Sequence, residues 1–229
     1  MYWGLETPLT ILLSVIGLII VIWAQWKINH AYAKYRTVKN KKGMSGAEVA
    51  RLILDRNGLE DIYVVETKGE LTDHYDPSRK VIRLSRQVFH GETIAGAAVA
   101  AHEVGHAIQD KEGYRPMRIR SALVPFVNLV SYLGYFGILI SLFAGITGYL
   151  FVCIIILCAT LLFQLITLPV EFDASKRALK ELEQANMIDA SEKEQAREML
   201  SAAAMTYVAS LVSNILNLIR LIIMTQDRD

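Results

Sequence analysis

Cysteine is scarce in this chain of 229 residues, and neither sign of charge is in excess. The two cysteines, Cys153 and Cys158, lie inside one long apolar segment, which excludes a disulfide framework and a pair of metal-binding thiolates facing water. Lysine and arginine number 24 against 23 aspartates and glutamates, and no basic run is interleaved with aromatic residues. These absences argue against a nucleic-acid-binding protein. Internal repeats and low-complexity tracts are also absent.

Basic residues are absent before the first apolar segment, residues 8–26, and Lys27 follows that segment at once. Because a secretory signal peptide begins with a basic region, this pattern predicts a retained membrane anchor instead. Trp3, Trp23 and Trp26 lie near the two ends of the segment, where indole rings favour the membrane interface.

Apolar residues are abundant, since 53% of the chain is hydrophobic and the mean hydropathy is +0.31. Four segments are long enough to cross a hydrocarbon core of about 30 Å: residues 8–26, 122–143, 148–168 and 202–224. The first three carry no formal charge. The last contains Asn214, Asn217 and Arg220, so it is expected either to span the membrane or to associate with it. The sequence therefore predicts a multi-pass protein of the lipid bilayer with about four transmembrane helices.

The basic residues gather beside three of these segments. The residues that follow the first apolar segment are Lys27, Lys34, Arg36, Lys39, Lys41 and Lys42. Those that precede the second are Arg115, Arg118 and Arg120, and those that follow the third are Lys176, Arg177 and Lys180. Because lysine and arginine concentrate on the cytoplasmic side of a membrane, these three flanks are expected to lie in the cytoplasm and both termini outside. The expected location is therefore the cytoplasmic membrane.

The chain between the first two apolar segments has the patterns of a small folded domain. Ser45 and Glu48 form a capping box before a helix at residues 47–57. Strand patterns follow at 62–65 and 81–84, joined through a turn-rich stretch. Two short strands do not form a stable sheet alone, so they are expected to pack on neighbouring helices.

A second polar block follows the third apolar segment. Residues 172–184 have helical periodicity, and residues 185–190 break it. Ser191 and Glu194 have the spacing of another capping box, which predicts a helix that starts there. This helix is expected to run without interruption into the last apolar segment.

Two histidines and a glutamate stand at the spacing of a zinc hydrolase motif in the run HEVGH, residues 102–106. At about 100° per residue, His102 and His106 lie one turn apart on one helical face, where both can bind a tetrahedral metal ion. Glu103 lies beside them and is the expected general base. The preceding run AGAAVAA is uncharged, which favours a buried helix over residues 92–110. The alternative is a helix that carries two ordinary histidines.

A catalytic zinc site needs a third protein ligand. One known pattern places it ten residues after the first histidine, with a glycine at the seventh, but Glu112 and Gln109 occupy these positions. Asp110 lies on the motif helix itself and would point past the metal. Glu171 fits a second pattern, a glutamate on a separate helix, because the membrane hairpin returns it to the side where the motif lies. The alternative is that Glu171 only starts a helix at the membrane boundary.

Three parts of the chain together resemble a known family: the HEVGH motif, the segments 73–77 and 84–85, and the segment 170–174. They resemble the neutral zinc metallopeptidases of bacterial membranes, the YugP type, over nearly the whole chain. More distantly they resemble the HtpX and CAAX prenyl protease group, which usually has an aspartate four residues after its glutamate. Here Asp173 stands two residues after Glu171, where it could accept a hydrogen bond from a ligating imidazole.

The resemblance implies a mostly α membrane protein, in which a gluzincin-like zinc peptidase domain with a small β-sheet is joined to about four transmembrane helices. It also implies endopeptidase chemistry with Zn²⁺ as cofactor, bound by His102, His106 and Glu171. Glu103 would take a proton from the attacking water and deliver it to the leaving amine. The expected substrate is a polypeptide, either a membrane protein or an unfolded protein, and no defined substrate follows.

Other residues are candidates for helping this reaction. His74, Tyr75 and Arg177 are candidates to stabilise the oxyanion, although turn positions and a lipid-phosphate contact would also explain them. The strand at 81–85 could pair with an extended substrate, as edge strands do, or simply pair within its own sheet. The polar run at 109–112 prevents the motif helix from spanning, so the site is expected in water or at the membrane surface.

These patterns predict five segments along the chain: an N-terminal transmembrane anchor at 1–26, a first cytoplasmic peptidase part at 27–120, a transmembrane hairpin at 121–168, a second peptidase part with the third ligand at 169–200, and a C-terminal transmembrane or membrane-associated helix at 201–229. The alternative function is a non-catalytic membrane adaptor or chaperone that retains the zinc fold. The intact Glu103 argues against it, because a purely structural metal site needs no base.

Overall fold

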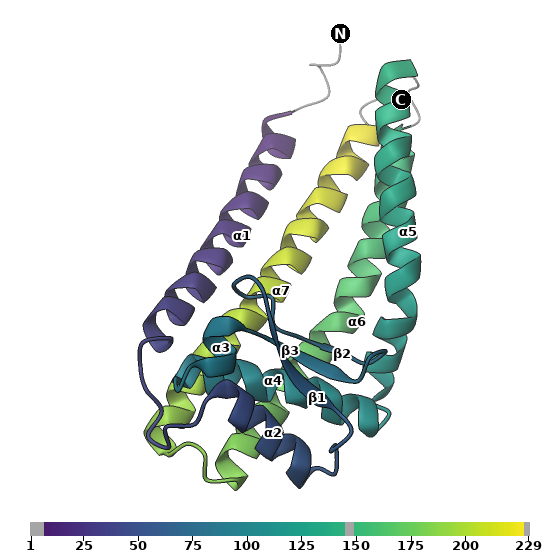
Figure 1. Cartoon of the computed structure of the whole chain (residues 1–229). Helices are drawn as coiled ribbons and strands as arrows, with labels where there is room; N and C mark the ends of the chain where they lie inside the picture. Colours follow the sequence, from purple (N-terminus) through teal and green to yellow (C-terminus); the bar gives the residue numbers. More distant parts are fainter. Residues whose placement is uncertain (1–6, 145–148, 227–229) are drawn as a thin grey trace. The chain divides into compact units, whose positions relative to one another are not determined.

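The computed structural model describes residues 7–144 and 149–226, which form seven helices and three strands (Figure 1). The chain divides into two compact units, each built from separate parts of the sequence. The first unit contains Met1–Gln25, Arg118–Leu168 and Thr206–Asp229. The second contains Trp26–Met117 and Pro169–Met205. The described part of the chain is mostly helical with one small sheet, as predicted.

Four long helices contribute to the first unit: α1 (Pro8–Tyr35), α5 (Arg115–Ala144), α6 (Tyr149–Gln184) and α7 (Ala190–Gln226). All four are long and apolar enough to cross a membrane, which confirms the prediction of about four such helices. A Cβ atom on Gly17 would lie 2.9 Å from Ser213 Oγ, so α1 and α7 approach each other closely there. Asn214 Nδ2 donates a hydrogen bond of 3.0 Å to Gln164 Oε1, which joins α7 to α6.

The second unit begins with the end of α1, from Trp26 to Tyr35, and continues with α2 (Gly46–Arg56), which is capped as the sequence predicts. Glu48 N donates to Ser45 Oγ at 3.3 Å, and Ser45 N donates to Glu48 Oε2 at 2.7 Å. At the other end Gly58 adopts φ +61°, and its N–H donates to Asp55 O. This positive φ suits glycine and lets the chain leave the helix.

The sheet contains β1 (Tyr63–Thr67), β2 (His74–Asp76) and β3 (Val81–Ser85) in the order β1-β3-β2. Strand β3 pairs with β1 in parallel and with β2 antiparallel. The prediction that residues 81–85 could offer a free edge to a substrate is therefore wrong, because neighbours cover both sides of β3. The sequence had also assigned β2 to a turn-rich connection. Three residues are too few to show an alternating pattern, and β2 is held in place by contacts with the motif helix.

Helix α3 (Arg86–His90) leads to the motif helix α4 (Ile94–Lys111), which begins after the N-cap Thr93. The Thr93 hydroxyl accepts a 3.1 Å hydrogen bond from Gly96 N. Most of α4 is buried, and it packs against α2 as well as against the sheet. Ile53, Leu54 and Val104 belong to the resulting core, and their exposure is 0%.

The second sequence segment of this unit contains parts of α6 and α7, which are separated by the predicted break. The expected capping box of Ser191 and Glu194 is wrong. Asp189 Oδ1 accepts a hydrogen bond of 2.9 Å from Glu192 N, and Glu192 Oε2 accepts one of 2.9 Å from Asp189 N. The box thus lies two residues earlier, because an aspartate caps a helix as well as a serine and also has a glutamate three residues on.

Candidate metal centre

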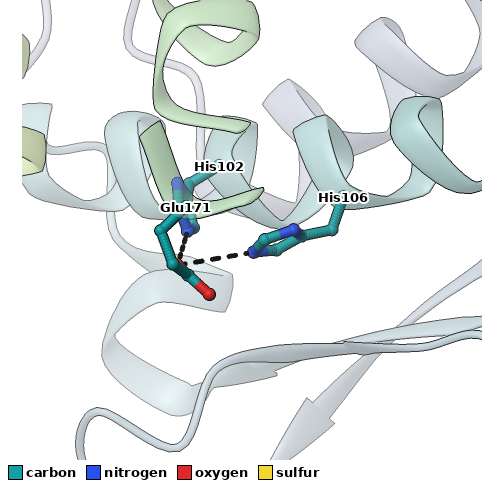
Figure 2. A group of neighbouring side chains, drawn as sticks. All are labelled: His102, His106 and Glu171. Atoms are coloured by element: carbon teal, nitrogen blue, oxygen red, sulfur yellow. Dashed lines mark ion pairs between the residues drawn. The ribbon is translucent and has the colours of Figure 1, made fainter. Parts of the chain in front are cut away.

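Helices α4 and α6 bring His102, His106 and Glu171 together (Figure 2). The Nε2 atom of His102 lies 3.3 Å from Glu171 Oε2, and the Nε2 atom of His106 lies 3.7 Å from the same oxygen. Glu171 is 3% exposed and His106 is 6% exposed. The donor atoms of the three residues all lie within 4.8 Å of one another, so this group could hold a metal ion.

The distances from Glu171 to the two histidines fit those between ligands of a tetrahedral zinc ion. Ligand atoms about 2.0–2.1 Å from zinc lie roughly 3.3–3.4 Å from one another at the tetrahedral angle. The two distances of 3.3 and 3.7 Å are close to that value. Two imidazoles and a carboxylate are also a donor set that leaves one position of a catalytic zinc free for water or substrate.

Gly105, between the two motif histidines, explains how α6 can approach α4. A Cβ atom at this position would lie 2.6 Å from the carbonyl oxygen of Ala174. Only glycine therefore permits this backbone contact without a shift of one helix. Since Ala174 is three residues beyond Glu171, the contact holds the third donor beside the two histidines.

Glu103 lies in the same centre and is held by the sheet. Its side chain is buried, and its Oε2 atom accepts a 2.9 Å hydrogen bond from the main-chain N–H of Tyr75 on β2. The hydroxyl of Tyr75 donates at 3.0 Å to Asp110 Oδ2, so one tyrosine contacts α4 at two places. Burial, followed by this bond to Asp110, raises the pKa of the Tyr75 hydroxyl. The sequence could not indicate the contact with Glu103, because it is made by a main-chain atom.

The ring nitrogens that face away from Glu171 have their own partners. His106 Nδ1 lies 3.0 Å from Gln109 Oε1, and His102 Nδ1 lies 3.2 Å from Ser175 Oγ. The sequence predicts this role for neither Gln109 nor Ser175, since nothing in the spacing of a glutamine or a serine indicates it. Asp173 had been expected to accept from an imidazole. Its described partners are instead Gln109 and Arg177, so that expectation is wrong for a direct contact.

The surroundings of His106 favour positive charge. Burial alone would lower the pKa of this imidazole, but Glu171 and Glu103 outweigh burial and leave the pKa raised. The same two carboxylates would attract a metal cation.

The other acidic candidates for the third ligand are engaged elsewhere. Asp110 accepts from Tyr75, and Glu112 Oε2 forms an ion pair of 2.7 Å with Arg177 Nη1. Neither belongs to the group of possible metal donors. Among the candidates for oxyanion stabilisation, Tyr75 and Arg177 thus already contact carboxylates, whereas His74 is exposed, with its Nδ1 2.8 Å from Thr72 O.

Comparison with known proteins defines the class to which this fold and centre belong. A family model described as "Putative neutral zinc metallopeptidase" matches residues 10–226, and the chain belongs to this family. It is 42% identical over 214 residues to the "Putative membrane protease YugP" of Bacillus subtilis (strain 168). The alignment covers 93% of this chain and 95% of that relative, which confirms the YugP-type resemblance. No solved structure matches the chain.

Proposed function

We propose that this protein is a membrane-anchored zinc endopeptidase that hydrolyses peptide bonds at the cytoplasmic surface of the membrane. In this proposal His102, His106 and Glu171 bind Zn²⁺, and Glu103 is the catalytic base. The observation that carries the proposal is the closeness of the three donors, which all lie within 4.8 Å of one another, with Glu103 next to one of them on α4. The membership of a zinc metallopeptidase family supports it.

In the proposed hydrolysis the metal ion and Glu103 have separate roles. When bound, zinc would supply a Lewis acid that polarises the scissile carbonyl and lowers the pKa of a water to about 7. One carboxylate oxygen of Glu103 accepts the N–H of Tyr75, which orients the group. The other oxygen is the one that takes the proton from the attacking water and passes it to the leaving amine.

The proposal includes the course of the chain across the membrane. Residues 1–26, 121–168 and 201–229 are membrane-associated, and residues 27–120 and 169–200 form the peptidase in the cytoplasm. The distribution of lysine and arginine supports this orientation. A peptidase placed there would act on polypeptides at the membrane surface, either membrane proteins or unfolded chains. The name of the Bacillus subtilis relative, "Putative membrane protease YugP", supports a polypeptide substrate and an association with the membrane.

Metal removal tests the proposal. The full chain, purified in detergent, should cleave casein, lose this activity after treatment with a zinc chelator, and recover it when Zn²⁺ alone is added back. A His102→Ala variant carried through the same treatment should recover nothing, which controls for a contaminating metalloprotease. Zinc binding that depends on His102 without any cleavage would instead favour the adaptor or chaperone.

A further inference from the structure

Gln109 is a fully buried polar side chain that the proposed chemistry does not use. It lies on α4 three residues beyond His106, and its exposure is 0%. A buried amide needs partners for both its N–H donors and its oxygen acceptor. Its described contacts satisfy all of these, and they lead from the metal centre to α6.

The amide nitrogen of Gln109 faces two acceptors on α6. Nε2 lies 2.8 Å from the carbonyl oxygen of Val170 and 2.8 Å from Asp173 Oδ2. A main-chain carbonyl can only accept a hydrogen bond. Asp173 Oδ2 also accepts from Arg177 Nε at 2.5 Å, so it presents an acceptor to both donors. These two acceptors determine which end of the amide is the nitrogen.

The orientation of the amide determines the position of the proton on His106. Since Nε2 of Gln109 faces α6, its Oε1 faces His106 Nδ1 at 3.0 Å. An amide oxygen only accepts, so the N–H must be on Nδ1 of the imidazole. In the neutral ring the lone pair is then on Nε2, the nitrogen that faces Glu171 at 3.7 Å.

We propose that Gln109 is a positioning residue that keeps His106 in the tautomer able to bind the metal, with Val170 and Asp173 fixing the orientation of its amide. The inference rests on the proposed function, because it requires His106 to be a metal ligand. Metal-binding histidines commonly donate their second N–H to a carboxylate or a carbonyl. Here the amide of Gln109 lies between the imidazole of His106 and the carboxylate of Asp173.

The two histidines differ in whether the partner of Nδ1 fixes the tautomer of the ring. The partner of His102 Nδ1 is the hydroxyl of Ser175 at 3.2 Å. A hydroxyl can both donate and accept, so it does not impose a tautomer. The contact with Ser175 therefore leaves the tautomer of His102 open, and only the tautomer of His106 is fixed by its partner.

Two substitutions separate this role from a packing role. Gln109→Glu and Gln109→Met both remove the N–H donors toward α6, so the melting temperatures of both metal-free proteins should fall. The melting temperature of Gln109→Glu should fall further, because a carboxylate oxygen then faces Val170 O and Asp173 Oδ2. Only Gln109→Glu keeps an oxygen that accepts from His106 Nδ1. The zinc dissociation constant, measured by competition with a chromophoric chelator on the full chain in detergent, should rise about 10- to 100-fold for Gln109→Met. For Gln109→Glu it should stay much closer to wild type.

A charge control and a spectroscopic measurement accompany these variants. Asp173→Asn changes the charge by one unit near the centre but leaves Gln109 an acceptor, so it calibrates the effect of charge on affinity. With Co²⁺ in place of zinc, wild type and Gln109→Glu should share the visible absorption of a tetrahedral site, and Gln109→Met should not.

Losses of zinc affinity that follow the losses in melting temperature, and so are at least as large for Gln109→Glu as for Gln109→Met, would show that Gln109 only joins α4 to α6. An affinity difference between them no larger than the effect of Asp173→Asn would also overturn the inference. Nitrogen NMR of metal-free wild type at alkaline pH tests it without any variant, since a neutral His106 with its proton on Nε2 contradicts it. If the proposed function itself fails, wild type will bind no zinc, or His102→Ala will bind it normally.

Discussion

Two glutamates near the motif, Glu171 and Glu112, differ in what surrounds their carboxylates. Glu171 is 3% exposed and faces two imidazoles within 3.7 Å. The side chain of Glu112 is 55% exposed, and its described partner is Arg177. A buried carboxylate beside two histidines could hold a cation, whereas an exposed one paired with an arginine contributes little to stability.

Glu171→Ala should therefore reduce the zinc bound per chain in purified protein, because it removes one of the three proposed ligands. Glu112→Ala, the matched control, should retain zinc near the wild-type content. Metal analysis of the two preparations measures both. The assignment of the third ligand would be overturned by the reverse result, with zinc lost from Glu112→Ala and kept by Glu171→Ala.

Glu103→Gln should separate catalysis from metal retention. Glutamine has an oxygen that can still accept from the Tyr75 N–H, so the fold and the bound zinc should survive. It cannot take a proton from water, so casein cleavage should fall by a factor on the order of 100 or more. Zinc content and cleavage are measured on the same preparation. Full zinc with undiminished proteolysis would falsify the role of Glu103.

At the scale of elements, the close approach of α4 and α6 depends on Gly105. A Cβ atom there would meet the main chain of Ala174, which cannot rotate away as a side chain would. In α5, by contrast, a Cβ on Gly137 would meet its nearest atom, Val152 Cγ1, only at 3.9 Å. The two glycines thus form a natural pair for a test.

Gly105→Ala should lower both the melting temperature and the zinc content. Overpacking costs about 1–3 kcal/mol, and the better helix propensity of alanine offsets about 1 kcal/mol of that. The displaced α6 would also carry Glu171 away from the histidines. Gly137→Ala gains the same propensity without a clash, so it should melt at or above the wild-type temperature. Thermal melts and metal analysis compare the two, and identical behaviour of both variants would contradict this account of Gly105.

The sequence predicts the elements that are determined by neighbouring residues along the chain. It misses the features that depend on contacts between residues far apart in the sequence. The helix that carries His102 and His106 follows from an uncharged run, and the box at Ser45 follows from spacing along the chain. Strand β2 was missed because its position depends on Tyr75 contacting α4. Gln109 was missed for the same reason, because its partners Val170 and Asp173 lie more than sixty residues away.

At the scale of the whole molecule, the proposed orientation of the chain in the membrane can be tested with one engineered cysteine on each side of the membrane. Thr225→Cys, near the end of α7, and Glu70→Cys, between β1 and β2, would each be made in a chain lacking Cys153 and Cys158. With both termini outside, an impermeant thiol reagent added to intact cells should label Thr225→Cys and spare Glu70→Cys until the cells are opened. Labelling only at position 70 in intact cells would invert the orientation.

The division of the second unit into two sequence segments has a consequence for biosynthesis. Its first segment ends at Met117 and its second begins at Pro169, with the whole of Arg118–Leu168 between them. In the proposed topology, a nascent chain therefore presents both histidines to the cytoplasm before the ribosome has made Glu171. In the proposed topology, the intervening hairpin must enter the bilayer before that carboxylate can return to meet them. The proposed peptidase would thus be synthesised at first without its third ligand, and its metal centre would be completed only after the hairpin has entered the bilayer.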